Sequence, residues 1–334
     1  MTQEAIWLGE QDISAQVALD EAINALESGL RSLGCGEGLN VTKALGGFDD
    51  GSSMHSLGSA LPGSGYCGFK NWINTKRGAK AVYVLFDATQ GRLLAIMEAN
   101  ALGQLRTAAM TGLGTRWIAP IAADDMAIIG SGRQALAQVA AVNAVRPLKR
   151  IRVWSPDSGH KHAFADLLRE NFATEVIESP TLAAATDSAS LVTIITRARD
   201  PFLSADLLAP GTHLNAVGAI LPANAEFKQD VFGRVGFIAV DDIENAKKGS
   251  RELIEYIDKN KQDRSWDQIY SLGSIIAKGI KRPAGCDISL FKSMGMGVSD
   301  LSVAIPAYER AHQSGLGQSL TLSEGPVSLR WKSN

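Results

Sequence analysis

Along the first third of the chain, the spacing of apolar side chains changes from helical to strand-like and back. Apolar positions recur every three or four residues in the helical segments and alternate in the hairpin. Glycine- and serine-rich sequence between them indicates short strands and turns. The pattern predicts, in order, a helix over 12–33, strands and turns over 41–68, a β-hairpin over 81–99 and a helix over 100–118.

From residue 125 onward, short apolar runs alternate with longer segments of helical spacing. The apolar runs are typical of buried strands, and we expect strands at residues 125–130, 149–155, 175–179, 190–196, 212–219 and 235–242. The intervening helices are expected at residues 133–145, 160–171 and 182–188. Strands that alternate with helices predict a parallel sheet with helices on both faces, which is an α/β fold.

The length of the chain and the position of the α/β unit predict two domains. At roughly 100–200 residues per domain, 334 residues suit two. We expect the α/β unit at residues 116–290, inserted between 1–115 and 291–334. These two outer segments would form the second domain together, with a last helix over 297–315 and a polar tail.

Composition narrows the class of protein. Apolar residues make up 45% and charged residues 20%, as in a globular protein with a full core. The net charge of -2 and the lack of a basic stripe argue against nucleic acid or an anionic membrane as partner. No signal peptide or run long enough to span a bilayer is visible, and three scattered cysteines suit a reducing compartment. We therefore expect a cytoplasmic protein without a metal site.

A glycine turn follows the first predicted strand of the α/β unit. It reads GxGxxA, with the six residues Gly130, Ser131, Gly132, Arg133, Gln134 and Ala135. In such a turn the first glycine permits a tight bend, the second lets a pyrophosphate approach the backbone, and the small third residue lets the helix pack on the strand. The free N–H groups of the helix then face the phosphates. The strand before the turn and the helix after it favour a Rossmann dinucleotide-binding domain.

The end of the second strand should distinguish NAD from NADP. An acid there holds the ribose hydroxyls of NAD, and an arginine holds the 2′-phosphate of NADP. Here Ser155 occupies the usual position of the acid, Asp157 follows, and His160–His162 adds three basic residues. Asp157 would repel a phosphate and the basic residues would attract one. The pattern favours NAD slightly and leaves NADP open.

Three cations stand in segments that otherwise carry little charge: Lys43, Lys70 and Arg106. A cation among small and apolar residues is costly to bury unless it is paired. If the three converge, a substrate carboxylate would pair with them, since guanidinium binds carboxylate as a bidentate fork. A lysine with a lowered pKa could also donate a proton. The alternative is that each cation forms a separate structural or surface ion pair.

Five segments in order along the chain resemble the ornithine cyclodeaminase/mu-crystallin family. The matching segments are GFK (68–70), LRTAAMTGLGTRWIA (105–119), IIGSGRQALAQ (128–138), PGTHLNAVGA (210–219) and ISLFKSMGMGVSDL (288–301). The resemblance implies a Rossmann domain, a second α+β domain that carries substrate and dimerises, and NAD or NADP as cofactor. It also implies a homodimer that acts on the C–N bond of an imino or amino acid.

The resemblance assigns roles residue by residue. It places the substrate carboxylate on Lys70 and Arg106, with Lys43 in place of a further arginine and His55 in the segment that shapes the pocket. Lys70 is also the expected proton donor. Cofactor contacts are expected from Thr107, Thr196, Asn215, Ala216 and Val217, in addition to the glycine turn, Ser155 and Asp157.

One position departs from the family pattern. Ornithine cyclodeaminases carry an aspartate where this chain has Ile220, and isoleucine can neither hold an ammonium group nor move a proton. The departure favours an imine reductase or amino-acid dehydrogenase over a cyclodeaminase that keeps its NAD and releases ammonia. A crystallin-like binding protein without catalysis is the third alternative. Glu226 and Glu98 are the remaining acids that could serve nearby.

Overall fold

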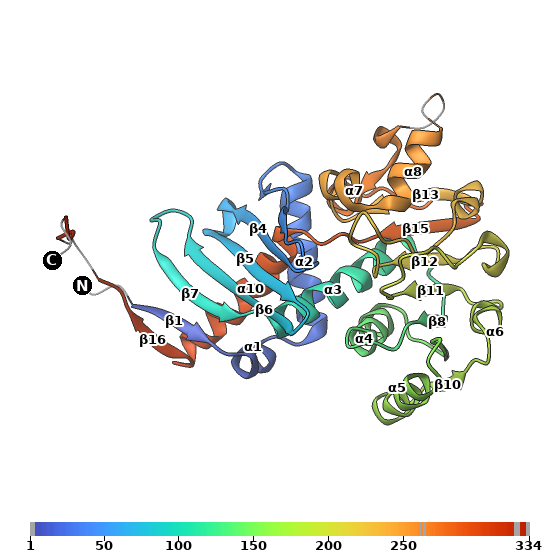
Figure 1. The fold of residues 1–334 in the computed structure, drawn as a ribbon, viewed down its shortest axis with the longest axis horizontal. Coiled ribbons are helices and arrows are strands. Elements are labelled where there is room, and N and C mark those ends of the chain that lie inside the picture. The colour runs from blue at the N-terminus through green and yellow to red at the C-terminus, as the bar shows by residue number, and fades with distance from the viewer. Residues whose placement is uncertain (1–3, 261, 263–264, 324–327, 332–334) are drawn as a thin grey trace.

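The computed structural model describes residues 4–260, 262, 265–323 and 328–331, and it holds two sheets side by side (Figure 1). The first sheet has the order β16-β1-β7-β6-β5-β4-β2, with β3 paired to β4. Its strands are β1 Glu4–Leu8, β2 Leu39–Asn40, β3 Ala44–Gly47, β4 Ser53–Leu61, β5 Tyr66–Thr75, β6 Gly78–Asp87, β7 Leu93–Glu98 and β16 Gln318–Thr321. The helices packed with it are α1 Glu10–Gln16, α2 Leu19–Gly34, α3 Asn100–Ile118 and α10 Gly297–Gln313.

Helices cover one face of the first sheet, and the strands alternate accordingly. Helix α10 packs against β4, β5 and β6, and it lies behind these strands in Figure 1. On β5, Gly68 and Lys70 are buried toward the helices, while Phe69 and Ile73 on the other face are exposed. Successive side chains of a strand point to opposite faces. The first sheet therefore has an inner face toward the helices and an open outer face.

The second sheet is parallel throughout, with the order β10-β9-β8-β11-β12-β15-β13-β14. Its strands are β8 Asp125–Ile129, β9 Arg150–Trp154, β10 Glu175–Glu178, β11 Leu191–Ile194, β12 His213–Ala216, β13 Val235–Val240, β14 Tyr270–Ser271 and β15 Ile288–Lys292. Its helices are α4 Ala135–Val145, α5 Ser158–Asn171, α6 Leu182–Thr186, α7 Ile243–Gly249, α8 Arg251–Lys259 and α9 Leu272–Lys278. The strand order reverses between β8 and β11, and in open α/β sheets ligands bind outside the carboxyl ends of the strands at such a point.

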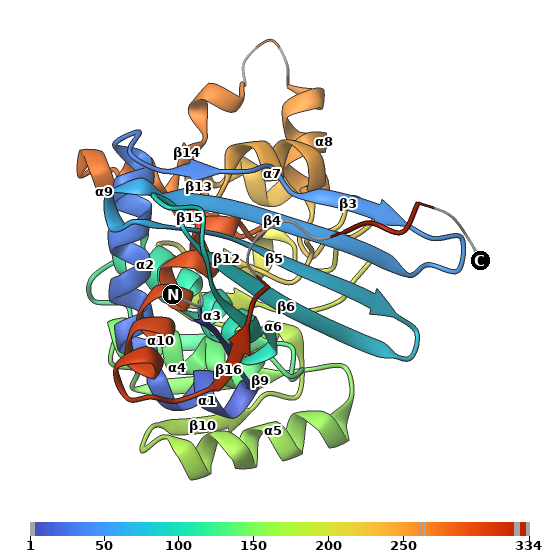
Figure 2. The same cartoon turned by 90° about the vertical axis from the view of Figure 1, so that its left-hand side faces the viewer.

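The predicted α/β fold with a parallel sheet is confirmed, and the strands and helices expected between residues 125 and 242 are present with shifted ends. The hairpin over 81–99 is the antiparallel pair β6–β7, and the helix over 100–118 is α3. Both chain ends enter the first sheet, because β1 pairs with β16. In Figure 2 these two strands lie side by side near the N-terminus.

The single helix expected over 12–33 is wrong, because the chain breaks between α1 and α2. Val17 is extended and buried in the core, and the Glu21 carboxylate accepts the N–H of Ala18 at 2.9 Å, which starts a new helix. A buried branched side chain and a capping acid thus override the apolar periodicity.

The sequence pattern missed strands β1, β15 and β16, the two-residue strands β2 and β14, and helices α7, α8 and α9. In β15 all five residues are buried, but Ser289 and Lys292 interrupt the apolar run. The predicted division between residues 290 and 291 falls inside this strand, which stays in the second sheet to Lys292. The division into two domains otherwise stays a prediction.

In the part of the chain that the structure describes, no helix combines the length and the apolar character that crossing a bilayer requires. Cys35, Cys67 and Cys286 are all free thiols.

Close contact between α2 and α9 joins the elements of the two sheets. A Cβ on Gly34 would lie 2.8 Å from the Cβ of Ala277 and closer still to the carbonyl of Gly273. A side chain at Gly34 would therefore force α2 and α9 apart. Overpacking of this kind typically costs about 1–3 kcal/mol.

We predict that Gly34→Ala lowers the free energy of unfolding by about 1–3 kcal/mol, because the helices must separate. Urea titration followed by circular dichroism measures this quantity. Gly47→Ala is the control, since a Cβ there meets no atom within 4 Å, and its effect should stay within about 0.5 kcal/mol. Equal losses in the two variants would contradict the proposed crowding.

Candidate functional site

Lys70 and Arg106 meet at one buried carboxylate, that of Asp300. Lys70 Nζ lies 3.1 Å from Asp300 Oδ1, and Arg106 Nε lies 3.3 Å from the same oxygen. Asp300 is fully buried and Lys70 is 6% exposed. Within the described residues, Asp300 Oδ2 has no hydrogen-bond partner. The two predicted cations thus lie together, on strand β5 and helix α3, with a counter-charge from α10.

Two glycines make room for this cluster. A Cβ on Gly103 of α3 would lie 2.6 Å from Lys70 Nζ, and a Cβ on Gly295 would lie 3.2 Å from Arg106 Nη1. Gly295 also has φ +82°, in the left-handed region where glycine is favoured. The backbone of α3 and of the segment before α10 can therefore approach the cations closely.

Lys43 belongs to the same electrostatic group. Burial lowers its pKa, a nearby Asp241 opposes that shift, and Arg106 adds to it. The Asp241 carboxylate is already occupied by Ser293 Oγ and by the N–H groups of Met294 and Gly295. The backbone of Lys43 is also held in place, because its N–H donates to Asn245 Oδ1 at 3.1 Å. All three cations predicted from the sequence are therefore close enough to interact.

Burial also lowers the pKa of Lys70, and the charge of Asp300 opposes this while Arg106 adds to it. A desolvated ammonium group loses its proton more readily, whereas a carboxylate at 3.1 Å stabilises the charged form. The protonation of Lys70 thus depends on its burial and on the opposing charges of Asp300 and Arg106.

His55 stacks on Trp72 beside these cations. Their ring centroids are 4.4 Å apart with an interplanar angle of 1°, and Lys70 Nζ lies 5.7 Å from the Trp72 ring centroid. Ser53 Oγ lies 2.8 Å from His55 Nε2, while His55 Nδ1 is buried without a partner in the described residues. Burial and the charge of Lys43 lower the pKa of His55, which favours the neutral ring.

The glycine turn lies at the carboxyl end of β8, next to β11. Gly130 has φ +112°, and a Cβ there would lie 2.5 Å from the carbonyl oxygen of Ile195. A Cβ on Gly132 would meet nothing within 4 Å, so the backbone there is bare. Gln104 Nε2 donates to the carbonyl of Arg133 at 3.0 Å and so ties the turn to α3. These features fit a pyrophosphate held against the turn.

Glu226 braces the neighbouring strand ends. Its carboxylate accepts the N–H and Oγ1–H of Thr196 after β11 and the N–H groups of Gly218 and Ala219 after β12, at 2.7–2.9 Å. The side chain is fully buried, and burial raises its pKa against the opposing charge of Lys292. Its oxygens are fully used, so Glu226 is a structural acid at this edge. Glu98 instead accepts the N–H of Glu10.

Other predicted cofactor residues have different surroundings. Asn215 is fully buried, its side chain bonds to Thr115, Thr193 and His213, and its backbone lies within β12 between β11 and β15. Ala216 and Val217 are buried at the end of β12. Thr107 Oγ1 donates to the carbonyl of Gly103 within α3. Their contacts with a cofactor stay predictions.

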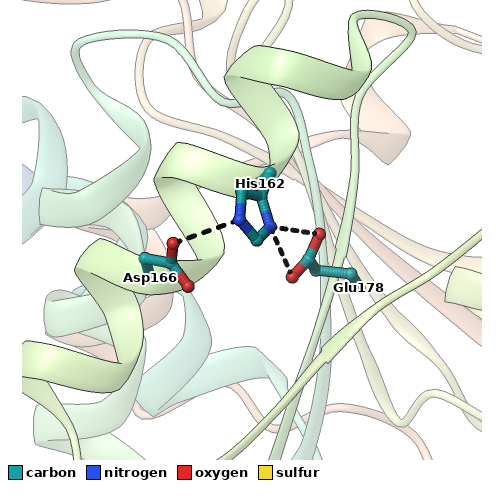
Figure 3. A group of neighbouring side chains, drawn as sticks. All are labelled: His162, Asp166 and Glu178. Atoms are coloured by element: carbon teal, nitrogen blue, oxygen red, sulfur yellow. Dashed lines mark hydrogen bonds and ion pairs between the residues drawn. The ribbon is translucent and has the colours of Figure 1, made fainter.

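Asp157 caps helix α5 by accepting the N–H of His160 at 2.7 Å, two residues after Ser155 at the end of β9. Lys161 Nζ donates to the carbonyl of Ser179. His162 lies between the carboxylates of Asp166 and Glu178 (Figure 3). The basic residues predicted to compete for a 2′-phosphate are thus engaged elsewhere.

The residues in Figure 3 are of the types that bind metals, but both acids of the group are already paired with an arginine. His162, Asp166 and Glu178 could each offer one ligand atom, and His162 and Asp166 are exposed. Arg169, however, bonds to both acids, at 2.7 Å to Asp166 and 3.1 Å to Glu178. An ion-pair network explains the group without a metal.

Sequence reasoning missed Asp300, Gly103 and Trp72. Asp300 lies inside the segment 288–301 that carries the family resemblance. Two cations that are expected to be buried need an acidic partner, and this requirement is the signal that points to Asp300. Trp72 follows Lys70 by two positions, which places both on one face of a strand.

Comparison with known proteins identifies the family of this chain. A profile of the Ornithine cyclodeaminase/mu-crystallin family matches residues 4–315. The chain belongs to this family. Alanine dehydrogenase of Archaeoglobus fulgidus is 26% identical over 95% of this chain and 98% of its own. Delta(1)-pyrroline-2-carboxylate reductase of Bacillus cereus is 29% identical over 73% of this chain and 74% of its own. Ketimine reductase mu-crystallin of Mus musculus is 29% identical over 69% of each chain.

Solved structures of family members share the fold. Delta(1)-pyrroline-2-carboxylate reductase of Thermococcus litoralis, in complex with NADH and L-proline, matches with a TM-score of 0.89 and 24% identity over 94% of this chain and 100% of its own. An archaeal alanine dehydrogenase dimer with bound NAD matches with a TM-score of 0.89 and 24% identity over 96% of this chain and 100% of its own. The relatives named here are oxidoreductases acting on C–N bonds of imines or amino acids.

We predict that Asp300→Asn lowers the free energy of unfolding at neutral pH by about 3–5 kcal/mol, because two buried cations lose their counter-charge. The loss should shrink as pH rises. Without Asp300 the pKa of Lys70 falls further, so the variant reaches its neutral amine at a lower pH than the wild type and recovers stability there.

Urea titrations of the wild type and the variant at neutral pH and at a pH near 9.5 test this, with the exposed Asp230→Asn as control. A stability difference that is the same at both pH values would show that Asp300 does not govern the protonation of Lys70.

Proposed function

We propose that this protein is an NAD(P)-dependent oxidoreductase that acts on the C–N bond of an imino or amino acid. The observation that carries the proposal is the pairing of Lys70 and Arg106 with Asp300, with Lys43 close enough to interact with Arg106. The family and its relatives support the reaction class. When bound, the nicotinamide would supply hydride to the α-carbon of the imine or accept it from the amine.

Arg106 and Lys70 would hold the substrate carboxylate. Among the described residues, the terminal nitrogens of Arg106 have no hydrogen-bond partner, so the guanidinium can receive a carboxylate on two parallel N–H groups. Asp300 Oδ1 lies 3.3 Å from Arg106 Nε, on the other side of the fork, in an ion pair without a hydrogen bond. Holding the carboxylate at two points sets the position of the α-carbon, and such positioning can contribute several kcal/mol to catalysis.

Lys70 would exchange the proton at nitrogen. Reduction of a neutral imine adds one hydride to carbon and one proton to nitrogen, and the proton must come from an acid. Lys70 is buried, its pKa is lowered, and it can donate a proton more readily than an exposed lysine. In the oxidative direction, the neutral amine of Lys70 would take the proton back.

The Gly130–Ala135 turn, with Thr196, would receive the dinucleotide. A bare backbone at Gly132 and the positive φ at Gly130 fit that group. We propose NAD as the preferred form, because Lys161 and His162 are engaged with other groups and Asp157 adds a negative charge. Solved relatives contain NADH or NAD, in agreement with this preference.

Ornithine cyclodeamination is the weaker candidate. Ile220 stands in the loop after β12 with 39% of its surface exposed and carries no acid. Glu226 cannot replace the missing aspartate, because four hydrogen bonds already occupy its oxygens. A protein with cofactor but no catalysis would not need a buried cluster of three cations.

We propose a homodimer formed through the outer face of the first sheet. Met54 of β4 and Ile73 of β5 are paired across the strands, 56% and 44% exposed, and Phe69 on the same face is 43% exposed. Apolar side chains gathered on an open sheet face indicate an interface. A related alanine dehydrogenase is described as a dimer. A cytoplasmic location stays a prediction of the sequence.

We predict that Lys70→Met lowers kcat/KM at least about 100-fold, because both a carboxylate contact and the proton donor are lost. The assay follows NADH and NADPH oxidation with pyruvate plus methylamine and with pyrroline and piperideine carboxylates. Lys76→Met, an exposed lysine on the β5–β6 turn, is the control and should behave as the wild type. Retained turnover in Lys70→Met would remove Lys70 from the mechanism.

We predict that Ile73→Lys converts a dimer into a monomer, because a charge would be buried in the proposed interface. Light scattering coupled to gel filtration measures the mass. Ile121→Lys is the control, since Ile121 is 90% exposed and precedes β8, away from this sheet. If the Ile73→Lys variant keeps the mass of the wild type, the interface lies elsewhere.

A further inference from the structure

The strand register places an uncovered apolar row next to Lys70. On the inner face of the first sheet, Leu45, His55, Trp72 and Ala81 pair across β3, β4, β5 and β6. The next row along the strands pairs Leu57, Lys70 and Tyr83. Residues two positions apart on a strand share a face. We call the first row the aromatic shelf (Leu45, His55, Trp72 and Ala81). It therefore adjoins Lys70 and Arg106, which we call the carboxylate clamp because we propose that they hold the substrate carboxylate.

Burial differs between the two rows. The Lys70 row is closed, with Leu57 at 1% and Tyr83 at 0% exposure. On the aromatic shelf, Leu45 is 50% exposed, and His55, Trp72 and Ala81 are partly exposed. Solvent exposure thus begins at the row next to Lys70, and a substrate whose carboxylate contacts Lys70 would extend its side chain across the shelf.

The shelf is rigid and largely uncharged. His55 and Trp72 are stacked in parallel, and Ser53 Oγ contacts His55 Nε2 and so fixes the ring. Neutral imidazole, indole and leucine surfaces favour a flat apolar group, because an ionised side chain would lose its hydration against them.

Two cations beside the shelf exclude a positive side chain. Lys70 Nζ lies 5.7 Å from the Trp72 ring centroid, and Lys43 is close enough to His55 to lower its pKa. An ω-ammonium group on the substrate would lie near these positive charges, and like charges repel. Ile220, at 39% exposure, offers no compensating acid.

We propose that Trp72 and His55 select α-imino acids whose side chain is a flat, uncharged ring, and that they disfavour small aliphatic and ω-ammonium substrates. This inference rests on the proposed function for the carboxylate clamp, and it goes beyond that function by assigning the side-chain subsite. Trp72, His55 and Leu45 are then specificity-determining residues.

The test compares kcat/KM for phenylpyruvate plus methylamine with that for pyruvate plus methylamine and for oxaloacetate plus methylamine. The wild type should prefer phenylpyruvate, and Trp72→Ala should reduce its preference over pyruvate about tenfold. Trp72→Phe, which keeps a flat ring, should retain most of the preference. Leu45→Ala, at an exposed position, should reduce it by a smaller factor and guards against a folding defect in Trp72→Ala.

Calorimetry of phenylpyruvate and pyruvate with the NADH-loaded protein separates the two proposals. Tighter binding of phenylpyruvate that Trp72→Ala abolishes, without turnover of any imine, would support the subsite and overturn the proposed function. Turnover with a wild-type preference for pyruvate or oxaloacetate, or a preference that Trp72→Ala leaves unchanged, would overturn the subsite and leave the function standing.

Discussion

The buried carboxylate of Asp300 is the interaction on which the proposed chemistry depends. It is fully buried and contacts two cations, Lys70 and Arg106, that come from a strand and a helix of the first sheet's layer. Without it, burial would drive Lys70 toward the neutral amine and leave Arg106 unpaired. With it, one oxygen pairs with both cations, while the terminal nitrogens of Arg106 have no hydrogen-bond partner among the described residues.

The second sheet contributes its geometry through main-chain groups. Gly130 allows the turn after β8, and Glu226 holds the chain after β11 and β12 by four hydrogen bonds. A buried carboxylate whose oxygens all accept hydrogen bonds stabilises the local backbone but is poorly suited to acid–base catalysis. Buried carboxylates of this chain thus have different roles, Asp300 for charge and Glu226 for shape.

Alternation along β4 and β5 gives each face of the first sheet its own role. Lys70 and Trp72 point to the inner face, and Phe69 and Ile73 to the outer face. The same strands can therefore supply the carboxylate clamp and the aromatic shelf on one side and the proposed dimer contact on the other. A shift of one residue in register would exchange the two faces, so the site and the interface are coupled through strand pairing.

The sequence by itself determined the elements whose signals are local. The apolar runs and helical spacing between residues 125 and 242, the hairpin and the glycine turn are all properties of neighbouring residues, and the structure contains them. The sequence also identified Lys43, Lys70 and Arg106 as cations in segments that otherwise carry little charge. Tertiary structure decided what local patterns do not carry: the break at Val17, the buried but polar strand β15, and the pairing of β1 with β16. It alone showed that Asp300, 230 positions from Lys70, is the partner of the cations, and that Asn215 faces the core. Such contacts join residues far apart in the chain, and burial and charge pairing are defined only once the chain has folded.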